Sequence, residues 1–140
     1  MTVCIDTNVV IRMWGRATAF LPLRQALIDR RVVWALSTDI LLEYEEVVAR
    51  EIEMNAAVKL FRFIEILDQT RGVIRFVSPN FRFRTIASDP DDDKFADCAI
   101  AVGADFIITS DHHFDVLIGS GYKPQPITPE EFIRRYPSGY

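Results

Sequence analysis

The chain has 140 residues, which corresponds to one domain, residues 1–140, and excludes an enzyme with a separate cofactor-binding domain. Hydrophobic residues make up 49% of the chain and charged residues 26%, a composition typical of a folded domain and not of a disordered one. The formal net charge of −4 argues against a protein that binds nucleic acid by positive charge alone. It leaves open an enzyme that reaches phosphates through metal ions.

No part of the sequence predicts a membrane span or an export signal. No apolar run reaches the ~18–20 residues that a span requires. Residues 1–14 lack a basic segment ahead of the apolar stretch and lack a signal-peptide cleavage site. Cys4 and Cys98 do not have metal-ligand spacing and are expected to be reduced thiols in the core. We therefore expect a cytoplasmic protein without membrane contact.

Predicted strands alternate with predicted helices along most of the chain. In the first half, apolar runs and capping residues predict a strand at 2–5, a helix at 17–30, a strand at 32–36, a helix at 40–51 capped by Ser37 or Thr38, and a helix at 55–69. In the second half they predict a strand at 73–77, a loop at 78–90, a helix at 91–102 ending at Gly103, a strand at 106–109, a short edge strand at 126–127, and a helix from Thr128-Pro129 to about Tyr136. This alternation predicts an α/β fold with a mostly parallel sheet of about four or five strands and helices on both faces. The two consecutive helices between residues 38 and 70 could form an arm beside the sheet.

Acidic residues follow two of the predicted strands. Asp6 ends the first strand, and Asp111 comes just after the strand at 106–109. Ligands of open parallel sheets bind at the carboxyl ends of the strands, so these two carboxylates converge if the strands are neighbours. A further group, residues 91–93, opens a helix, where carboxylates also serve as caps. Asp93 and Asp97 share one helix face, where like charges repel unless a cation lies between them.

A further acid is expected from the helix at 40–51, which carries Glu43, Glu45 and Glu46. Helical geometry alone does not choose among the three. Several carboxylates without a cluster of His and Cys favour Mg²⁺ or Mn²⁺ over Zn²⁺. One or two such ions would relieve the repulsion among the acids, activate a water and stabilise charge on a phosphate.

Four segments in a fixed order carry a family resemblance. They are Asp6-Thr7-Asn8-Val9, the run Ser37–Val47, the run Asp89–Ala101, and the run Ala104–Asp111 with its Thr-x-Asp pattern. Each segment alone is weak evidence for a family, but the four segments in this order are specific evidence. The chain resembles the PIN-domain family, the metal-dependent ribonucleases that include VapC-like toxins of toxin–antitoxin pairs.

The resemblance implies a PIN-like three-layer α/β/α fold with an acidic pocket for one or two Mg²⁺ or Mn²⁺ ions. Matched by motif, the catalytic acids are Asp6, Glu43, Asp93 and Asp111. The metal ligands are Asp6, Asp93 and Asp111, with Asp97 as an additional or alternative ligand. The polar positions that orient these acids or a metal-bound water correspond to Asn8, Thr109 and Ser110.

The resemblance also implies the reaction: hydrolysis of RNA phosphodiester bonds by a metal-activated water, leaving a 5′-phosphate and a 3′-hydroxyl. The partners that it implies are an RNA substrate, an antitoxin protein and a second copy of the chain in a homodimer. The alternative is a catalytically silent PIN-like protein or an RNA-binding module. A signalling receiver domain is disfavoured, because Asp6 stands alone after the first strand and Ser78-Pro79 follow the third.

Other groups allow two interpretations each. His112 and His113 are expected in loop or solvent roles, because adjacent residues of an extended stretch point apart. Arg12 and Arg16 could contact RNA or form surface ion pairs. The stretch with Phe76, Phe81 and Phe83, interleaved with Arg82 and Arg84, could stack bases, although a loop that packs its Phe side chains onto the core is the simpler interpretation. Trp14 and Trp34 are expected in the core or at an interface.

Overall fold

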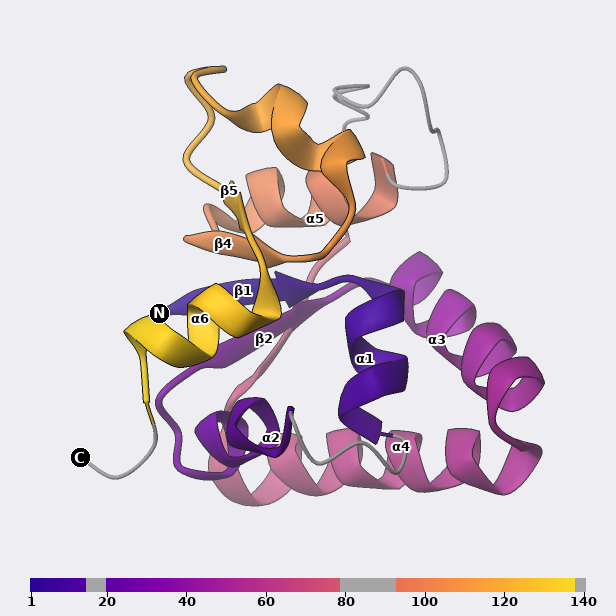
Figure 1. Ribbon diagram of the computed structural model, residues 1–140. Helices are drawn as coiled ribbons and strands as arrows, with labels where there is room; N and C mark the ends of the chain where they lie inside the picture. Colours follow the sequence, from indigo (N-terminus) through magenta and orange to yellow (C-terminus); the bar gives the residue numbers. More distant parts are fainter. Residues whose placement is uncertain (15–19, 79–92, 138–140) are drawn as a thin grey trace.

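Five parallel strands form the centre of the molecule. The computed structural model describes residues 1–14, 20–78 and 93–137. The strands are β1 (Thr2–Ile5), β2 (Val33–Leu36), β3 (Ile74–Phe76), β4 (Phe106–Ile108) and β5 (Gln125–Ile127). They lie in the order β3-β2-β1-β4-β5, and every neighbouring pair is parallel (Figure 1). The predicted parallel sheet is confirmed.

The central strand β1 is buried on both faces. Val3, Cys4 and Ile5 have no exposed surface. Their apolar run is the pattern expected of a parallel strand that is covered on both sides. β1 pairs with β2 through Val3 and Trp34 and with β4 through Ile5 and Ile108. This register brings the carboxyl ends of β1 and β4 to the same edge of the sheet.

Helices cover both faces of the sheet, which makes the three layers that were predicted. The helices are α1 (Thr7–Trp14), α2 (Leu21–Ile28), α3 (Thr38–Glu51), α4 (Met54–Ile66), α5 (Asp93–Val102) and α6 (Pro129–Arg135). α5 packs against β1, β2 and β4 on one face, and α1 and α2 lie on the opposite side (Figure 1). α3 contacts both α1 and α5, so it lies where the two helical layers meet at one end of the sheet.

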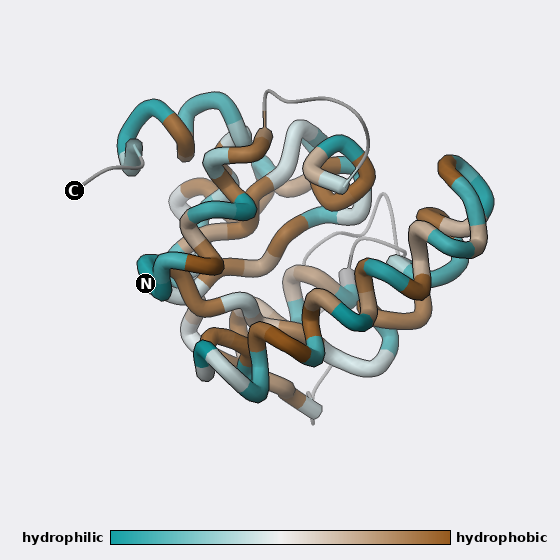
Figure 2. The backbone as a smooth tube through the Cα atoms, turned by 90° about the horizontal axis from the view of Figure 1, so that it is seen from below, coloured by the Kyte–Doolittle hydropathy of each residue, from teal (hydrophilic) through white to brown (hydrophobic). Residues whose placement is uncertain are grey.

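The two consecutive helices α3 and α4 pack against each other beside the sheet, as expected. Leu60 and Ile64 of α4 are buried, while Val58 on another face is exposed. Figure 2 shows the same alternation as changes between hydrophobic and hydrophilic residues along the helices. α4 continues into a π-helical turn, η1 (Leu67–Arg71), which ends at Gly72.

Three helical segments differ from the sequence prediction. The helix expected at 17–30 is shorter, Leu21–Ile28, and α1, which was not predicted, precedes it. α1 is rich in β-branched residues, which have low helix propensity. Burial of Val9, Val10 and Met13 against the core stabilises it instead. A 3₁₀ segment, η2 (His112–Leu117), was also not predicted.

The predicted C-cap at Gly103 is confirmed. Its φ of 63° lies in the left-handed region that favours glycine. Its amide donates to the carbonyl of Ile100 at 3.1 Å, and the amide of Ala104 donates to the carbonyl of Ala99 at 2.9 Å. This pair of hydrogen bonds closes the end of α5.

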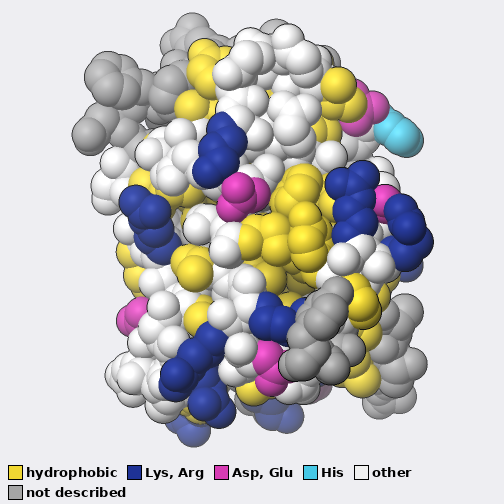
Figure 3. All heavy atoms as spheres, turned by 90° about the vertical axis from the view of Figure 1, so that its left-hand side faces the viewer, with side chains coloured by type: hydrophobic (Ala, Val, Ile, Leu, Met, Phe, Trp, Pro, Cys, Tyr) yellow, Lys and Arg dark blue, Asp and Glu magenta, His cyan; other side chains and the backbone are white. Residues whose placement is uncertain are grey.

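An aromatic cluster joins α6 to β4 at the opposite end of the sheet from the carboxyl edge. The ring of Phe106 lies 6.3 Å from Phe132 and 6.2 Å from Tyr136, measured between centroids. Figure 3 shows hydrophobic side chains gathered in the middle of the face on the left of Figure 1, with Lys and Arg side chains around them. Among the described residues, no helix has the length and apolar character needed to cross a membrane.

Candidate active site

The carboxyl ends of β1 and β4 meet directly. The amide of Asp6 donates to the carbonyl of Ile108 at 2.9 Å, one residue beyond the last paired strand positions. Asp6 then starts α1, because its carbonyl accepts from the amides of Val9 and Val10. The strand order therefore places Asp6 and the segment after β4 side by side, as expected for neighbouring strands.

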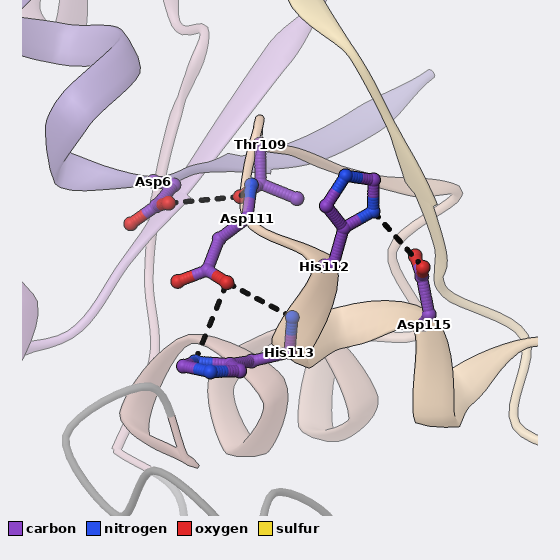
Figure 4. A network of polar contacts seen from close by, with 6 residues as sticks. All are labelled: Asp6, Thr109, Asp111, His112, His113 and Asp115. Carbon is purple, nitrogen blue, oxygen red and sulfur yellow. Dashed lines mark hydrogen bonds and ion pairs between the residues drawn. The ribbon is translucent and has the colours of Figure 1, made fainter.

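A threonine hydroxyl links the two acids of this edge (Figure 4). Oγ1 of Thr109 donates to Oδ2 of Asp6 at 2.8 Å and accepts from the amide of Asp111 at 2.9 Å. Thr109 and Asp6 are both buried, with Asp6 only 4% exposed. One buried side chain thus fixes the positions of Asp6 and of the turn that carries Asp111.

Asp111 caps the 3₁₀ segment η2. Its Oδ1 accepts from the amide of His113 at 2.9 Å and lies 3.3 Å from Nδ1 of the same residue. His113 therefore belongs to this site, a position that the sequence did not indicate. His112 instead pairs with Asp115 at 3.2 Å, and its side chain is almost fully exposed, in agreement with a solvent role (Figure 4).

Glu43 faces the same edge from α3. Its Oε2 accepts from the hydroxyl of Thr7, and its Oε1 lies 2.8 Å from Nζ of Lys94. The hydroxyl of Tyr44, the next residue of α3, donates to the carbonyl of Ile5 and ties the helix to the end of β1. Glu45 and Glu46 are exposed, so of the three glutamates only Glu43 contacts this site in the described structure.

Burial dominates the electrostatics of Asp6. It raises the pKa of the Asp6 carboxyl from 3.8 to about 6. The hydrogen bonds from the Thr109 hydroxyl and the Thr7 amide lower this pKa, and the negative charges of Asp111 and Glu43 raise it again. A buried carboxylate close to two other acids is the environment in which a bound cation relieves most repulsion.

The structure connects the remaining predicted site residues less closely to Asp6 and Asp111. Asp97 is buried on α5 and has an interaction partner. Asp93 is the first residue of α5, and its side chain lies outside the described part. Asn8 and Ser110 are exposed.

The aromatic and basic residues singled out in the sequence have mixed positions. Trp34 is fully buried in the core. Trp14 packs against the core, and its Nε1 donates to the carbonyl of Ala56 at 3.0 Å. The guanidinium of Arg12 lies over the ring of Phe20 at 4.5 Å. Phe76 is exposed. The predictions for Arg16, Phe81, Arg82, Phe83, Arg84 and residues 91–92 concern positions outside the described residues.

Sequence reasoning missed Thr7, Lys94 and His113. Thr7 and Lys94 each follow a predicted acid directly and His113 lies two residues after Asp111, which was the available signal. Lys94 carries a second signal, because a cation in the first turn of a helix opposes the helix dipole and calls for another explanation.

The donor set fits a hard divalent cation. The side chains at this edge offer carboxylate and hydroxyl oxygens, the ligands that Mg²⁺ and Mn²⁺ prefer. Asp6 and Asp111 are joined through Thr109 and electrostatically coupled. Within residues 1–14, 20–78 and 93–137, no three His, Cys, Asp or Glu side chains are close enough to form a complete metal site. The described residues alone therefore form no complete metal site, and Asp6 and Asp111 contribute carboxylate oxygens at one edge of the sheet.

Comparisons with known proteins show the family and the fold of the chain. A family model described as the PIN domain matches residues 2–113. Among solved structures, the chain is similar to one described as the crystal structure of VapBC2 from Rickettsia felis bound to a DNA fragment from their promoter. That similarity has a TM-score of 0.57 at 14% sequence identity and covers 90% of this chain and 98% of the other. A search of curated proteins found no match.

Proposed function

The chain belongs to the PIN domain family, and from this premise we propose that it is a ribonuclease that depends on Mg²⁺ or Mn²⁺. PIN domains are generally nucleases that use divalent metals. The observation that carries the proposal is the buried Asp6 carboxylate, linked through Thr109 to Asp111 where β1 and β4 end. A structural role alone does not explain a buried carboxylate that has no Lys or Arg ion pair in the described part of the chain, since burial disfavours its charge.

In this proposal Asp6 and Asp111 hold a divalent ion, and Asp93 and Asp97 complete its ligands. A bound ion would activate a water and stabilise the charge that develops on the phosphate. Thr109 positions Asp6 by its hydrogen bond and sets the turn that presents Asp111. Glu43, held at the edge of the site by Thr7 and Lys94, orients the water or the RNA backbone.

The test is cleavage of a mixed, end-labelled RNA pool by purified protein with Mn²⁺ and with EDTA. We expect cleavage with Mn²⁺ only, and products with a 5′-phosphate. Asp6→Asn and Asp111→Asn should each abolish it. Asp115→Asn is the matched control, because Asp115 lies in the same 3₁₀ segment as His113 and pairs with exposed His112. Equal cleavage by wild type and Asp6→Asn would contradict the proposal, and so would activity that survives EDTA.

We further propose that the protein acts as a toxin with an antitoxin partner. The support is the family together with the likeness to a VapBC2 complex. Expression of the wild-type chain without a partner should then stop cell growth, while Asp6→Asn should not. Normal growth with abundant, metal-dependent ribonuclease would refute the toxin role and leave the nuclease proposal standing.

A further inference from the structure

Lys94 is the least expected group at the candidate site. It is the second residue of α5, and its Nζ lies 2.8 Å from Oε1 of Glu43 on α3. Both side chains are largely shielded from water, with 24% of Lys94 and 21% of Glu43 exposed. The other Lys or Arg ion pairs of the described residues include at least one partner that is considerably more exposed.

Helix stability does not account for Lys94. A positive charge in the first turn of a helix is disfavoured by the helix dipole, which favours acids there. The ion pair compensates by joining α5 to α3 across the carboxyl edge of the sheet. The position of the amino group is therefore set by Glu43 and by the acidic surroundings.

Both carboxylate oxygens of Glu43 have a partner. Oε1 is taken by Lys94 and Oε2 by the hydroxyl of Thr7. In Figure 4 the Thr109 hydroxyl donates to Oδ2 of Asp6, and the contacts of Asp111 with His113 use Oδ1. Of these three acids, Glu43 has an ammonium group beside it, whereas Asp6 and Asp111 have no Lys or Arg ion pair within the described residues.

Charge counting leads to the same division. Asp6, Asp111 and Glu43 contribute three negative charges that act on one another, and Lys94 contributes one positive charge. Lys94 already neutralises Glu43, so the charges of Asp6 and Asp111 are the ones that a divalent ion would neutralise. A second divalent ion next to Glu43 would have to displace the ammonium group.

We propose that Lys94 is a built-in cation that holds Glu43 away from metal coordination and limits this site to one divalent ion. Lys94 is then a positioning residue that acts through Glu43. The inference rests on the proposed metal site, and it adds the number of ions and the residue that sets it.

The test is Mn²⁺ titration followed by electron paramagnetic resonance of free Mn²⁺ and by calorimetry, both without RNA. We expect one ion per wild-type chain. Lys94→Met should bind two ions, because it frees Glu43, and the double variant Lys94→Met with Glu43→Gln should return to one. Lys94→Arg keeps the charge and should keep one ion. Lys123→Met is the surface control, since Lys123 is exposed and pairs with Asp105 elsewhere.

Glu43→Gln in the otherwise wild-type chain provides a second test that does not depend on removing Lys94. It should still bind one Mn²⁺ with an affinity within about threefold of wild type. Loss of Mn²⁺ binding in Glu43→Gln would overturn the inference, because Glu43 would then be a ligand. Two ions in the wild type, or one ion in Lys94→Met, would overturn it as well.

These outcomes separate the inference from the proposed function. If the wild type binds Mn²⁺ and Asp6→Asn does not, the metal site stands, and the Lys94 and Glu43 variants decide this inference alone. If the wild type binds no Mn²⁺, the proposed metal site is refuted and the inference falls with it.

Discussion

The burial of Asp6 predicts that replacing this acid stabilises the metal-free protein. Its carboxyl has a pKa of about 6 in the folded chain against 3.8 for the free group. Since one pKa unit corresponds to 1.36 kcal/mol, the charged form of Asp6 costs about 3 kcal/mol at neutral pH. Asp6→Asn removes the charge and keeps an oxygen that can accept from Thr109. We therefore expect the variant to be the more stable protein at pH 7 in EDTA.

The raised pKa of Asp6 determines whether stability rises or falls with pH. Between pH 4 and pH 6 the folded state retains a proton on Asp6 that the unfolded state has released. Stability therefore falls as pH rises through this window, and the contribution of the protonated group is complete only below the unfolded pKa of 3.8. The difference in unfolding free energy between Asp6→Asn and wild type should grow from about 0.6 kcal/mol at pH 4 to about 3 kcal/mol at pH 7.

Urea unfolding at several pH values in EDTA measures this difference directly. Hydrogen bonds of the new amide add an offset that does not change with pH, so the growth of the difference is the informative quantity. Asp115→Asn, at an exposed acid, should differ from wild type by less than about 0.5 kcal/mol at every pH. A difference for Asp6→Asn that stays constant or shrinks from pH 4 to pH 7 would refute the reasoning. Added Mn²⁺ should stabilise wild type and leave Asp6→Asn unchanged.

Three further predictions concern the surroundings of the site and the core. Thr109→Val should lower the free energy of unfolding by about 1–3 kcal/mol in chemical unfolding, because it leaves the amide of Asp111 without its acceptor. Thr109→Ser keeps the hydroxyl and should retain most of the wild-type stability. Equal losses in the two variants would contradict the role of the hydroxyl. Leu60→Ala should cost about 2–5 kcal/mol by urea unfolding, since this side chain is fully buried, whereas Val58→Ala on the exposed face of α4 should cost less than about 0.5 kcal/mol; similar losses would show that α4 packs differently. Gly103→Ala should lower the free energy of unfolding by about 1–2 kcal/mol through backbone strain alone, because open space surrounds the position of the new Cβ atom; an unchanged midpoint would rule out the left-handed cap.

The sheet and two acids of the site were predictable from local patterns. The short apolar runs of β1 and β4 each lead to a polar segment with an aspartate, and parallel strands present such ends at one edge. The pairing of these two strands confirmed that Asp6 and the turn before Asp111 lie together. The cap at Gly103 was readable because one residue type serves that backbone conformation.

Other features depend on contacts that no local pattern contains. α1 has β-branched residues at Val9 and Val10 and is held by their burial, so helix propensity did not reveal it. Helical geometry did not choose Glu43 over its neighbours, and the family motif selected it; its contacts with Thr7 and Lys94 come from the packing of distant segments. The contact between His113 and Asp111 required the 3₁₀ turn, whereas an extended chain would have pointed the ring elsewhere.

The most direct test of the account is anomalous diffraction from crystals of the protein soaked in Mn²⁺, with data collected near the manganese absorption edge. The account predicts one strong peak between the carboxylates of Asp6 and Asp111, with Lys94 still bound to Glu43. The same soak of Asp6→Asn should show no peak there. A wild-type crystal with no manganese at this edge of the sheet, or with manganese bound only at other surface acids, would contradict the central claim that these two aspartates form a divalent-metal site.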